Sequence, residues 1–132
     1  MNNDLTLRRK SYAAAKEIKA SAHYAYIVNG ITLDGSKFTV SELVVEGQCL
    51  VRNNSTGKYE KYVETNPGTF PAGYSNPVIL DESILFKPLD DGTNPDLTAG
   101  QVLVHGAVYT SLLVGCTDTF MKQLSGAIRF ID

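Results

Sequence analysis

The distribution of apolar and polar residues separates a polar N-terminal part from a longer part built of short apolar runs. Residues 1–9 are mostly polar and have no periodic pattern, so we expect them to form a flexible arm. Residues 10–22 contain five alanines together with lysine and glutamate, which favours a helix that Ser11 would cap. The apolar stripe of this helix is thin, so we expect the helix to need a partner surface for stability.

β-Branched and aromatic residues become frequent from Tyr24 onwards and predict two hairpins. Asp34 and Gly35 lie between the runs "YAYIVNGITL" and "SKFTV", and an Asp-Gly pair in this position predicts a type I′ turn. The runs "VVEGQCLVRN" and "KYEKYV" flank "NSTG", which predicts a second hairpin with Gly57 in the left-handed conformation. Both hairpins place short strands in the first half of the body.

Two segments rich in turn-forming residues interrupt the apolar runs of the second half. Residues 65–77 and 87–100 are predicted to be long loops, and the first of them is not expected to form a central strand or a helix. Residues 78–86 ("VILDESILF") lie between the loops and predict one short buried strand. Long ordered loops of this kind often contact a partner.

The C-terminal part combines the longest predicted strand with one helix. Residues 101–114 ("QVLVHGAVYTSLLV") form that strand, and Gly106 in its interior indicates a bulge or a close approach of another segment. A short helix over residues 117–126 and a strand over residues 127–131 follow. The helix residues with an expected role are Thr117 or Asp118 as the cap, Phe120, Met121 and Leu124 as core residues, and Gly126 as the end.

These elements predict a mainly β (α+β) fold. We expect a small β-barrel or β-clip-like body of about six to eight strands, with one short C-terminal helix. A flexible, partly helical and basic N-terminal arm would occupy residues 1–22, and a single β-rich domain would occupy residues 23–132. A chain of 132 residues has the length of one such domain.

Charge is distributed unevenly between these two parts. Residues 1–22 hold five basic and two acidic side chains, a net charge of +3, so a total of −2 leaves −5 for the remainder. A basic arm ahead of an acidic body suits binding to nucleic acid or to an acidic protein surface. We find no apolar run long enough to span a bilayer and no signal sequence, so we expect a soluble protein.

The residues capable of chemistry do not form a recognisable catalytic or metal-binding motif. Cys49 and Cys116 have apolar neighbours and are expected to be buried free thiols, which suits a reducing compartment. His105 lies in the longest strand, on the same face as Tyr109, and is interpreted as a half-buried or interface residue. Cys116 precedes a helix but no base accompanies it. We therefore expect no enzyme activity, cofactor or metal.

Two further clusters receive a structural interpretation. Tyr59 and Tyr62 alternate with Lys58 and Lys61, which is a weak indication of a nucleic-acid-binding surface on a small barrel. The acidic body argues against this interpretation. The acidic run at residues 90–96 lacks the ligand spacing of a calcium loop and is interpreted as a solvated turn.

An ordered series of segments over residues 44–132 resembles the lambda-like bacteriophage head decoration proteins. "GQCLVRNNSTGKYEKY" is similar to the opening hairpin of that family, and "NPVILDESI" to its central strand with an acidic end. "TAGQVLVHGAVYTSLL" is similar to its strand with an internal glycine, and "FMKQLSGAIRFID" to its closing helix and strand. The order and spacing of the segments carry the resemblance, which is weaker over residues 1–43.

The resemblance implies a capsid-stabilising protein of the virion exterior that is assembled in the host cytoplasm. Members of the family bind the major capsid protein as homotrimers at three-fold positions of the expanded head and help it resist internal DNA pressure. The resemblance implies no nucleic acid, membrane or small-molecule partner. Their N-terminal segment contacts the capsid, which assigns that role to Leu5, Leu7, Arg8, Arg9 and Lys10. His105 and Tyr109 are the candidate trimer-interface residues.

Three alternatives remain at this point. The first is another structural protein of the virion, such as a head fibre or joining protein. The second is a small oligonucleotide-binding β-barrel, and the third is an enzyme with an unrecognised site. A trimer that binds expanded capsids supports the decoration protein, whereas tight, salt-sensitive binding to single strands supports the barrel.

Overall fold

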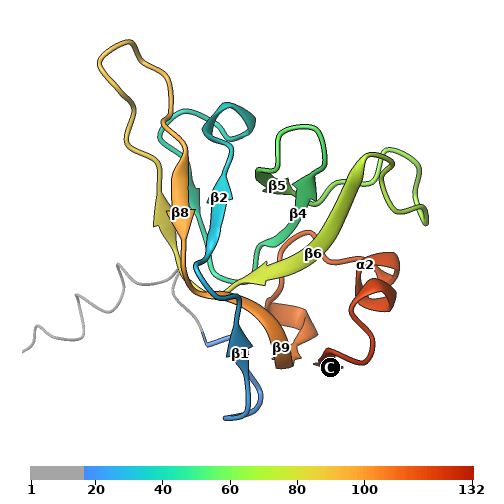
Figure 1. Cartoon of the computed structure of the whole chain (residues 1–132). Coiled ribbons are helices and arrows are strands. Elements are labelled where there is room, and N and C mark those ends of the chain that lie inside the picture. The colour runs from blue at the N-terminus through green and yellow to red at the C-terminus, as the bar shows by residue number, and fades with distance from the viewer. Residues whose placement is uncertain (1–16) are drawn as a thin grey trace, which may run out of the picture.

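A computed structural model describes residues 17–132, which form a mainly β fold with one short C-terminal helix (Figure 1). Its larger sheet has eight strands in the order β1-β9-β6-β4-β5-β2-β8, with β10 also paired to β9, and β3 pairs with β7 in a second sheet. The strands are β1 (Ala25–Tyr26), β2 (Ile31–Leu33), β3 (Leu43–Val44), β4 (Cys49–Asn53), β5 (Tyr59–Lys61), β6 (Tyr74–Leu80), β7 (Ile84–Leu85), β8 (Leu97–Ala99), β9 (Val102–Tyr109) and β10 (Ile128–Ile131). The helices are α2 (Asp118–Gln123) and the 3₁₀ turns η1 (Gly35–Lys37) and η2 (Thr110–Leu112). The predicted fold class is confirmed.

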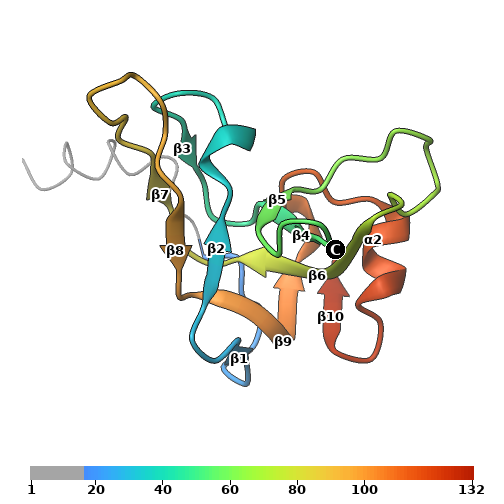
Figure 2. The same cartoon turned by 45° about the horizontal axis from the view of Figure 1, so that its top comes forward.

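The large sheet curves into a half-barrel whose central strands are buried on both faces. Along β4, Leu50 packs into one hydrophobic cluster, whereas its neighbours Cys49 and Val51 pack into another. Alternation of this kind follows from the two-residue period of a strand. The β3–β7 sheet lies at one end of the molecule, and α2 with β10 lies at the other (Figure 2).

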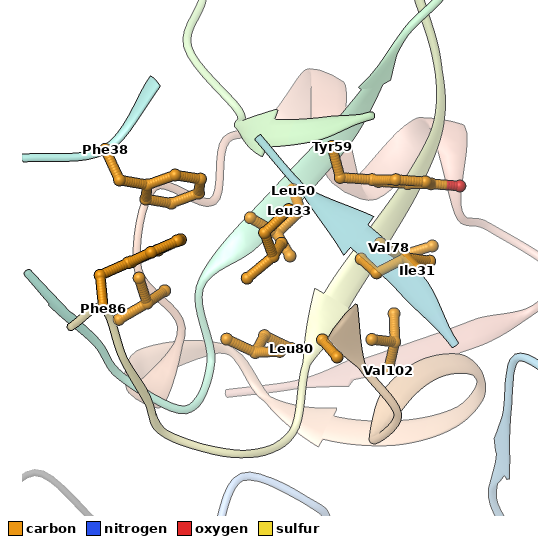
Figure 3. Packing of buried hydrophobic residues seen from close by; sticks show 11 residues of the cluster. Ile31, Leu33, Phe38, Leu50, Tyr59, Val78, Leu80, Phe86 and Val102 are labelled. Atoms are coloured by element: carbon orange, nitrogen blue, oxygen red, sulfur yellow. The ribbon is translucent and has the colours of Figure 1, made fainter. Parts of the chain in front are cut away.

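The first cluster fills the concave region between the large sheet and the β3–β7 sheet. Leu33, Leu50 and Leu80 converge in its centre, and the rings of Phe38 and Phe86 stack beside them (Figure 3). The centroids of these two rings are 5.0 Å apart, at the separation of an offset-stacked aromatic pair. The small sheet is therefore held by the same core as the large one.

The second cluster lies between the other face of the sheet and α2. Phe120 of α2 is fully buried and contacts the ring of Tyr62 edge-on, with centroids 4.9 Å apart. Thr117 caps the helix by accepting a hydrogen bond from the Phe120 amide (3.1 Å), and Gly126 adopts a positive φ of 93° just beyond it. The predicted helix, its cap and the strand that follows it are confirmed.

The second cluster also includes the beginning of the described chain. Ile18 is completely buried, although the sequence places it in the N-terminal arm. The Tyr109 N–H donates to the Ile18 carbonyl (2.8 Å), and Lys19 forms a bridge with Val108 of β9. Residues 17–22 are not helical, so the helix prediction is wrong for this part, because pairing with β9 and burial of Ile18 outweigh local helix propensity. The rest of the predicted helix, with Ser11, lies outside the described residues.

The Asp34-Gly35 pair does not form the predicted hairpin. The Asp34 carboxylate accepts a hydrogen bond from the Ser36 N–H (3.1 Å) and caps η1 instead. Strand β2 pairs with β8 and β5. A Cβ on Gly35 would lie 2.3 Å from the Pro95 carbonyl oxygen, so this glycine is required for a close approach and not for a positive φ.

The second hairpin is confirmed, because β4 and β5 are antiparallel and Gly57 has a φ of 76°. The loop prediction for residues 65–77 is wrong at its end, where β6 begins at Tyr74 and includes Pro77 in a central strand. Asn76 and Pro77 together lie opposite Val51 in a bulge, where a proline without an N–H is tolerated.

Two other sequence segments divide differently from the prediction. Residues 78–86 supply the end of β6 and, after a turn, the separate strand β7. The predicted loop at residues 87–100 contains β8, which pairs with β2. The β8 segment has little apolar pattern and becomes a strand because β2 supplies hydrogen bonds to its backbone.

Gly106 marks a close approach, as predicted. A Cβ there would lie 3.0 Å from the Cβ of Tyr24, and the φ of Gly106 is 145°. The side-chain alternation of β9 also shifts by one residue near this glycine. Val102 and Val104 pack with the first cluster, whereas Val108 packs with the second. The two-residue period that placed His105 and Tyr109 on one face is therefore interrupted between them.

Candidate functional site

A group of hydrogen-bonded polar side chains lies where the N-terminal segment joins the body. We define the anchor as Ile18, Lys19, Tyr26 and Asp81. The Lys19 ammonium donates to the Asp81 carboxylate with an Nζ–Oδ2 distance of 2.7 Å, and the Tyr26 hydroxyl donates to the same oxygen at 2.5 Å. The anchor thus connects three segments that are distant in the sequence.

Local structure explains how these side chains meet. Asp81 follows the last residue of β6, where its N–H donates to the Gln101 carbonyl (2.8 Å). Tyr26 lies on β1 opposite Leu103 of β9, and the bridge between Lys19 and Val108 places Lys19 beside the same strand. Strand β9 is therefore the common support for the anchor.

The electrostatics of the anchor keep the lysine protonated. Burial acts to lower the pKa of Lys19, but its hydrogen bonds to Asp81 and Glu17 and the charge of Asp81 outweigh burial and raise this pKa. Burial and the hydrogen bond to Asp81 raise the pKa of the Tyr26 hydroxyl. A protonated amine and a neutral phenol cannot act as nucleophiles or bases, so the anchor is suited to holding the chain.

The surroundings of the anchor form an open, acidic depression of about 520 Å³. Glu17 receives a hydrogen bond from Lys19 (3.0 Å), and the ring of Tyr24 lies 4.9 Å from the same ammonium. The depression is lined by Glu17, Lys19, Glu46, Asp81, Glu82, Ser83 and Gln101. Four carboxyl side chains and one lysine lie among these residues, so acidic groups predominate in the lining.

The sequence did not single out Asp81 or Tyr26. An acidic residue directly after the apolar run Val78–Leu80 was the available signal, but such a residue is also common in an exposed turn. The Asp81 side chain is only 2 % exposed and that of Lys19 is 14 % exposed. Buried charges of this kind are almost always paired, which only the three-dimensional arrangement reveals.

The two predicted interface residues lie on β9 and are exposed. His105 borders a depression of about 530 Å³ that is also lined by residues of α2 and β10, among them Met121 and Phe130. Tyr109 is 40 % exposed, and its backbone is hydrogen-bonded to the anchor residue Ile18. The structure thus brings Tyr109 next to the anchor, and it leaves both side chains accessible.

The predicted capsid-binding residues of the arm are outside the described residues. This applies to Leu5, Leu7, Arg8, Arg9 and Lys10. Their role remains a prediction.

The residues considered for nucleic-acid binding do not form a stacking platform. Tyr59 and Tyr62 are 6 % and 3 % exposed, so their rings are not available to bases. Lys58 pairs with Asp96 at 2.7 Å, and Lys61 pairs with Glu42. This arrangement weakens the interpretation as an oligonucleotide-binding barrel.

The acidic run at residues 90–96 is explained by local contacts. Asp91 accepts hydrogen bonds from the amide (3.0 Å) and hydroxyl (2.6 Å) of Thr93. Asp96 accepts one from the Gly35 amide (2.9 Å) in addition to its ion pair with Lys58. Within residues 17–132, no group of three or more His, Cys, Asp or Glu side chains is arranged to hold a metal ion.

An exposed apolar pair lies on the small sheet. Leu43 and Leu85 are directly opposite each other on β3 and β7 and are 46 % and 49 % exposed. Cross-strand pairing brings them together, so no local pattern in the sequence indicates that they form one patch.

Comparison with known proteins yields no relative. No family model matches this chain, and no curated protein and no solved structure matches it. In the part of the chain that the structure describes, no helix has the length and apolar character needed to cross a membrane.

Proposed function

We propose that this protein is a bacteriophage capsid decoration protein. It binds the outside of the expanded head as a trimer at three-fold positions and stabilises the shell against internal DNA pressure. The sequence resemblance over residues 44–132 is the starting point of the proposal. The anchor is the structural observation that supports it best.

A decoration protein must transmit load between the shell and its own body. The N-terminal segment preceding the anchor carries the basic residues Arg8, Arg9, Lys10 and Lys16. Its first described residues are fixed to β9 by backbone hydrogen bonds, by the burial of Ile18 and by the ion pair of Lys19. Tension on this segment would therefore act on a strand that pairs with β1, β6 and β10.

Trimeric assembly strengthens attachment by such a segment. Three tethers of one trimer bind neighbouring shell subunits at high effective concentration, so contacts that are weak one at a time give stable binding together. The basic residues favour an acidic shell surface. An extended segment can also add a strand to the sheet of a shell subunit.

Binding to purified expanded heads tests the proposal. The full-length protein should co-sediment with heads and form a trimer in solution or on the shell, as measured by light scattering and electron cryo-microscopy. Replacing Arg8, Arg9 and Lys10 with alanine should reduce binding more than tenfold at moderate salt. A control with the same loss of charge replaces the exposed body residues Lys37, Lys87 and Lys122 and should bind almost normally.

Two results would contradict the proposal. One is a protein that does not bind expanded heads at any salt concentration while its circular dichroism shows a folded body. The other is tight, salt-dependent binding to single-stranded nucleic acid, which would favour the oligonucleotide-binding alternative.

A further inference from the structure

The two cysteines of the chain, 67 positions apart in the sequence, meet in the second cluster. Val114 forms a parallel bridge with Gln48, its carbonyl accepts from the Cys49 N–H (3.0 Å), and its N–H donates to the Gly47 carbonyl (2.9 Å). The chain then turns at Gly115, whose φ is 78°, and reaches Cys116 beside Cys49. The backbone pairing of Cys49 with Val114, two residues before Cys116, thus brings the two thiols into the same cluster.

The environments of the two thiols differ. Cys49 is completely buried on β4, whereas Cys116 is only partly buried just before the cap of α2. The interaction with Cys116, together with burial, raises the pKa of Cys49. The same interaction lowers the pKa of Cys116. The partly exposed thiol is therefore also the one that forms a thiolate more readily.

We propose that Cys49 and Cys116 form a disulfide-exchange site that reacts with small-molecule disulfides and closes into an intramolecular disulfide. The inference goes beyond the proposed function and does not depend on shell binding. Both cysteines were expected to be buried free thiols, but Cys116 is only partly buried. The pair is suited to react because this thiol is accessible and the other lies in the same cluster.

The reaction with glutathione disulfide proceeds in two exchanges. The Cys116 thiolate attacks one sulfur of glutathione disulfide, which forms a mixed disulfide and releases one glutathione thiolate. The Cys49 thiolate then attacks the sulfur of Cys116 and releases the second glutathione. Two protein thiols and one glutathione disulfide thus yield one protein disulfide and two glutathione molecules, which carry the two thiol protons.

Closure of this bond connects the C-terminal unit to the middle of the sheet. Cys49 lies on β4 between β6 and β5, and Cys116 leads directly into α2 and β10. Among the described strands β10 pairs only with β9. The disulfide therefore adds a covalent cross-link between β4 and this end of the molecule, in addition to the chain itself. In a reducing cytoplasm the thiols stay free, and the bond forms after exposure to an oxidising medium.

The test exposes the folded, full-length protein to glutathione disulfide at mildly alkaline pH. Alkylation under denaturing conditions followed by intact mass measurement should show the loss of both free thiols and of two hydrogen atoms. Proteolysis should give a peptide that joins Cys49 to Cys116. The closed form should unfold at a temperature higher by roughly 10 °C, because the bond closes a long loop of the unfolded chain.

Two single variants separate the roles of the thiols. Cys49→Ala should stop at a mixed disulfide on Cys116, and Cys116→Ala should stay unmodified while folded, since its remaining thiol is buried. Circular dichroism checks that each variant is folded. The peptide map of the wild-type protein tests the proposal even if a variant fails to fold. Wild-type protein that stays reduced, that stops at the mixed disulfide or that forms disulfide-linked dimers would overturn the proposal.

Discussion

Lys19 and Asp81 form an ion pair whose Nζ–Oδ2 distance is 2.7 Å, and this pair fixes the N-terminal segment to the turn after β6. Tyr26 donates to the same carboxylate oxygen, so one aspartate holds groups from two other segments. Removing its charge leaves a largely buried ammonium without its main partner. Such a loss is more destabilising than that of an exposed pair.

Asp81→Asn should therefore lower the free energy of unfolding by about 1–3 kcal/mol. Urea denaturation followed by circular dichroism measures this change. Glu17→Gln is the matched control, because Glu17 contacts the same ammonium from an exposed position, with 63 % of its side chain accessible. The control should change stability by less than about 0.5 kcal/mol. Equal effects of the two substitutions would argue against the anchor.

Ile18 tests whether the body begins before residue 23. Ile18→Ala removes a completely buried side chain from the second cluster and should lower the free energy of unfolding by about 2–4 kcal/mol. Val28→Ala is the control, since Val28 is 82 % exposed. Denaturant unfolding of both variants decides the question. An Ile18→Ala variant with an unchanged free energy of unfolding would place this residue in a separable arm, as the sequence suggested.

Gly35 tests the close approach that replaces the predicted hairpin. Gly35→Ala places a Cβ 2.3 Å from the Pro95 carbonyl oxygen and 2.8 Å from that of Asn94, so the backbone must shift. We expect a loss of about 1–3 kcal/mol in thermal or denaturant unfolding. Gly100→Ala is the control, because no atom lies within 4 Å of its added Cβ. A Gly35→Ala variant as stable as this control would contradict the packing at η1.

Glu64 links the loop after β5 to the cap of α2. Its carboxylate accepts hydrogen bonds from the Thr117 hydroxyl (2.5 Å), the Tyr62 hydroxyl (2.5 Å) and the Gly68 amide (2.9 Å). The hydrogen bonds from Thr117, Tyr62 and Gly68 lower the pKa of Glu64 below its ordinary value of 4.5. A carboxyl group with a lowered folded-state pKa stabilises the protein above its unfolded-state pKa and loses this contribution as the pH falls.

The stability difference between the wild type and Glu64→Gln should consequently be largest at neutral pH. It should decrease as the pH falls below 4.5 and through the lower pKa of the folded protein. Urea unfolding of both proteins over an acidic pH series measures this difference. Glu82→Gln, a change at another carboxylate that accepts backbone hydrogen bonds, controls for the general effect of acid. A stability difference that stays constant with pH would show that Glu64 is not the titrating group.

The candidate site was only partly predictable from the sequence. Tyr109 was named as an interface residue and lies beside the anchor, but Asp81, Tyr26 and the burial of Ile18 were not anticipated. The partners of the anchor come from three segments, and no local pattern specifies which segments meet. The facing cysteines were missed for the same reason, since they lie on β4 and before α2.

The sequence by itself determined the mainly β class, the hairpin around Gly57, the long strand with Gly106 and the capped C-terminal helix. Each of these depends on residues close together in the chain: a turn glycine, a two-residue alternation or a capping hydroxyl. Only the tertiary structure decided that residues 17–22 are not helical, that Asp34 caps a 3₁₀ turn and that Pro77 lies in a central strand. In these places, backbone pairing and burial against distant segments contribute more free energy than local propensity, so the local signal is overridden.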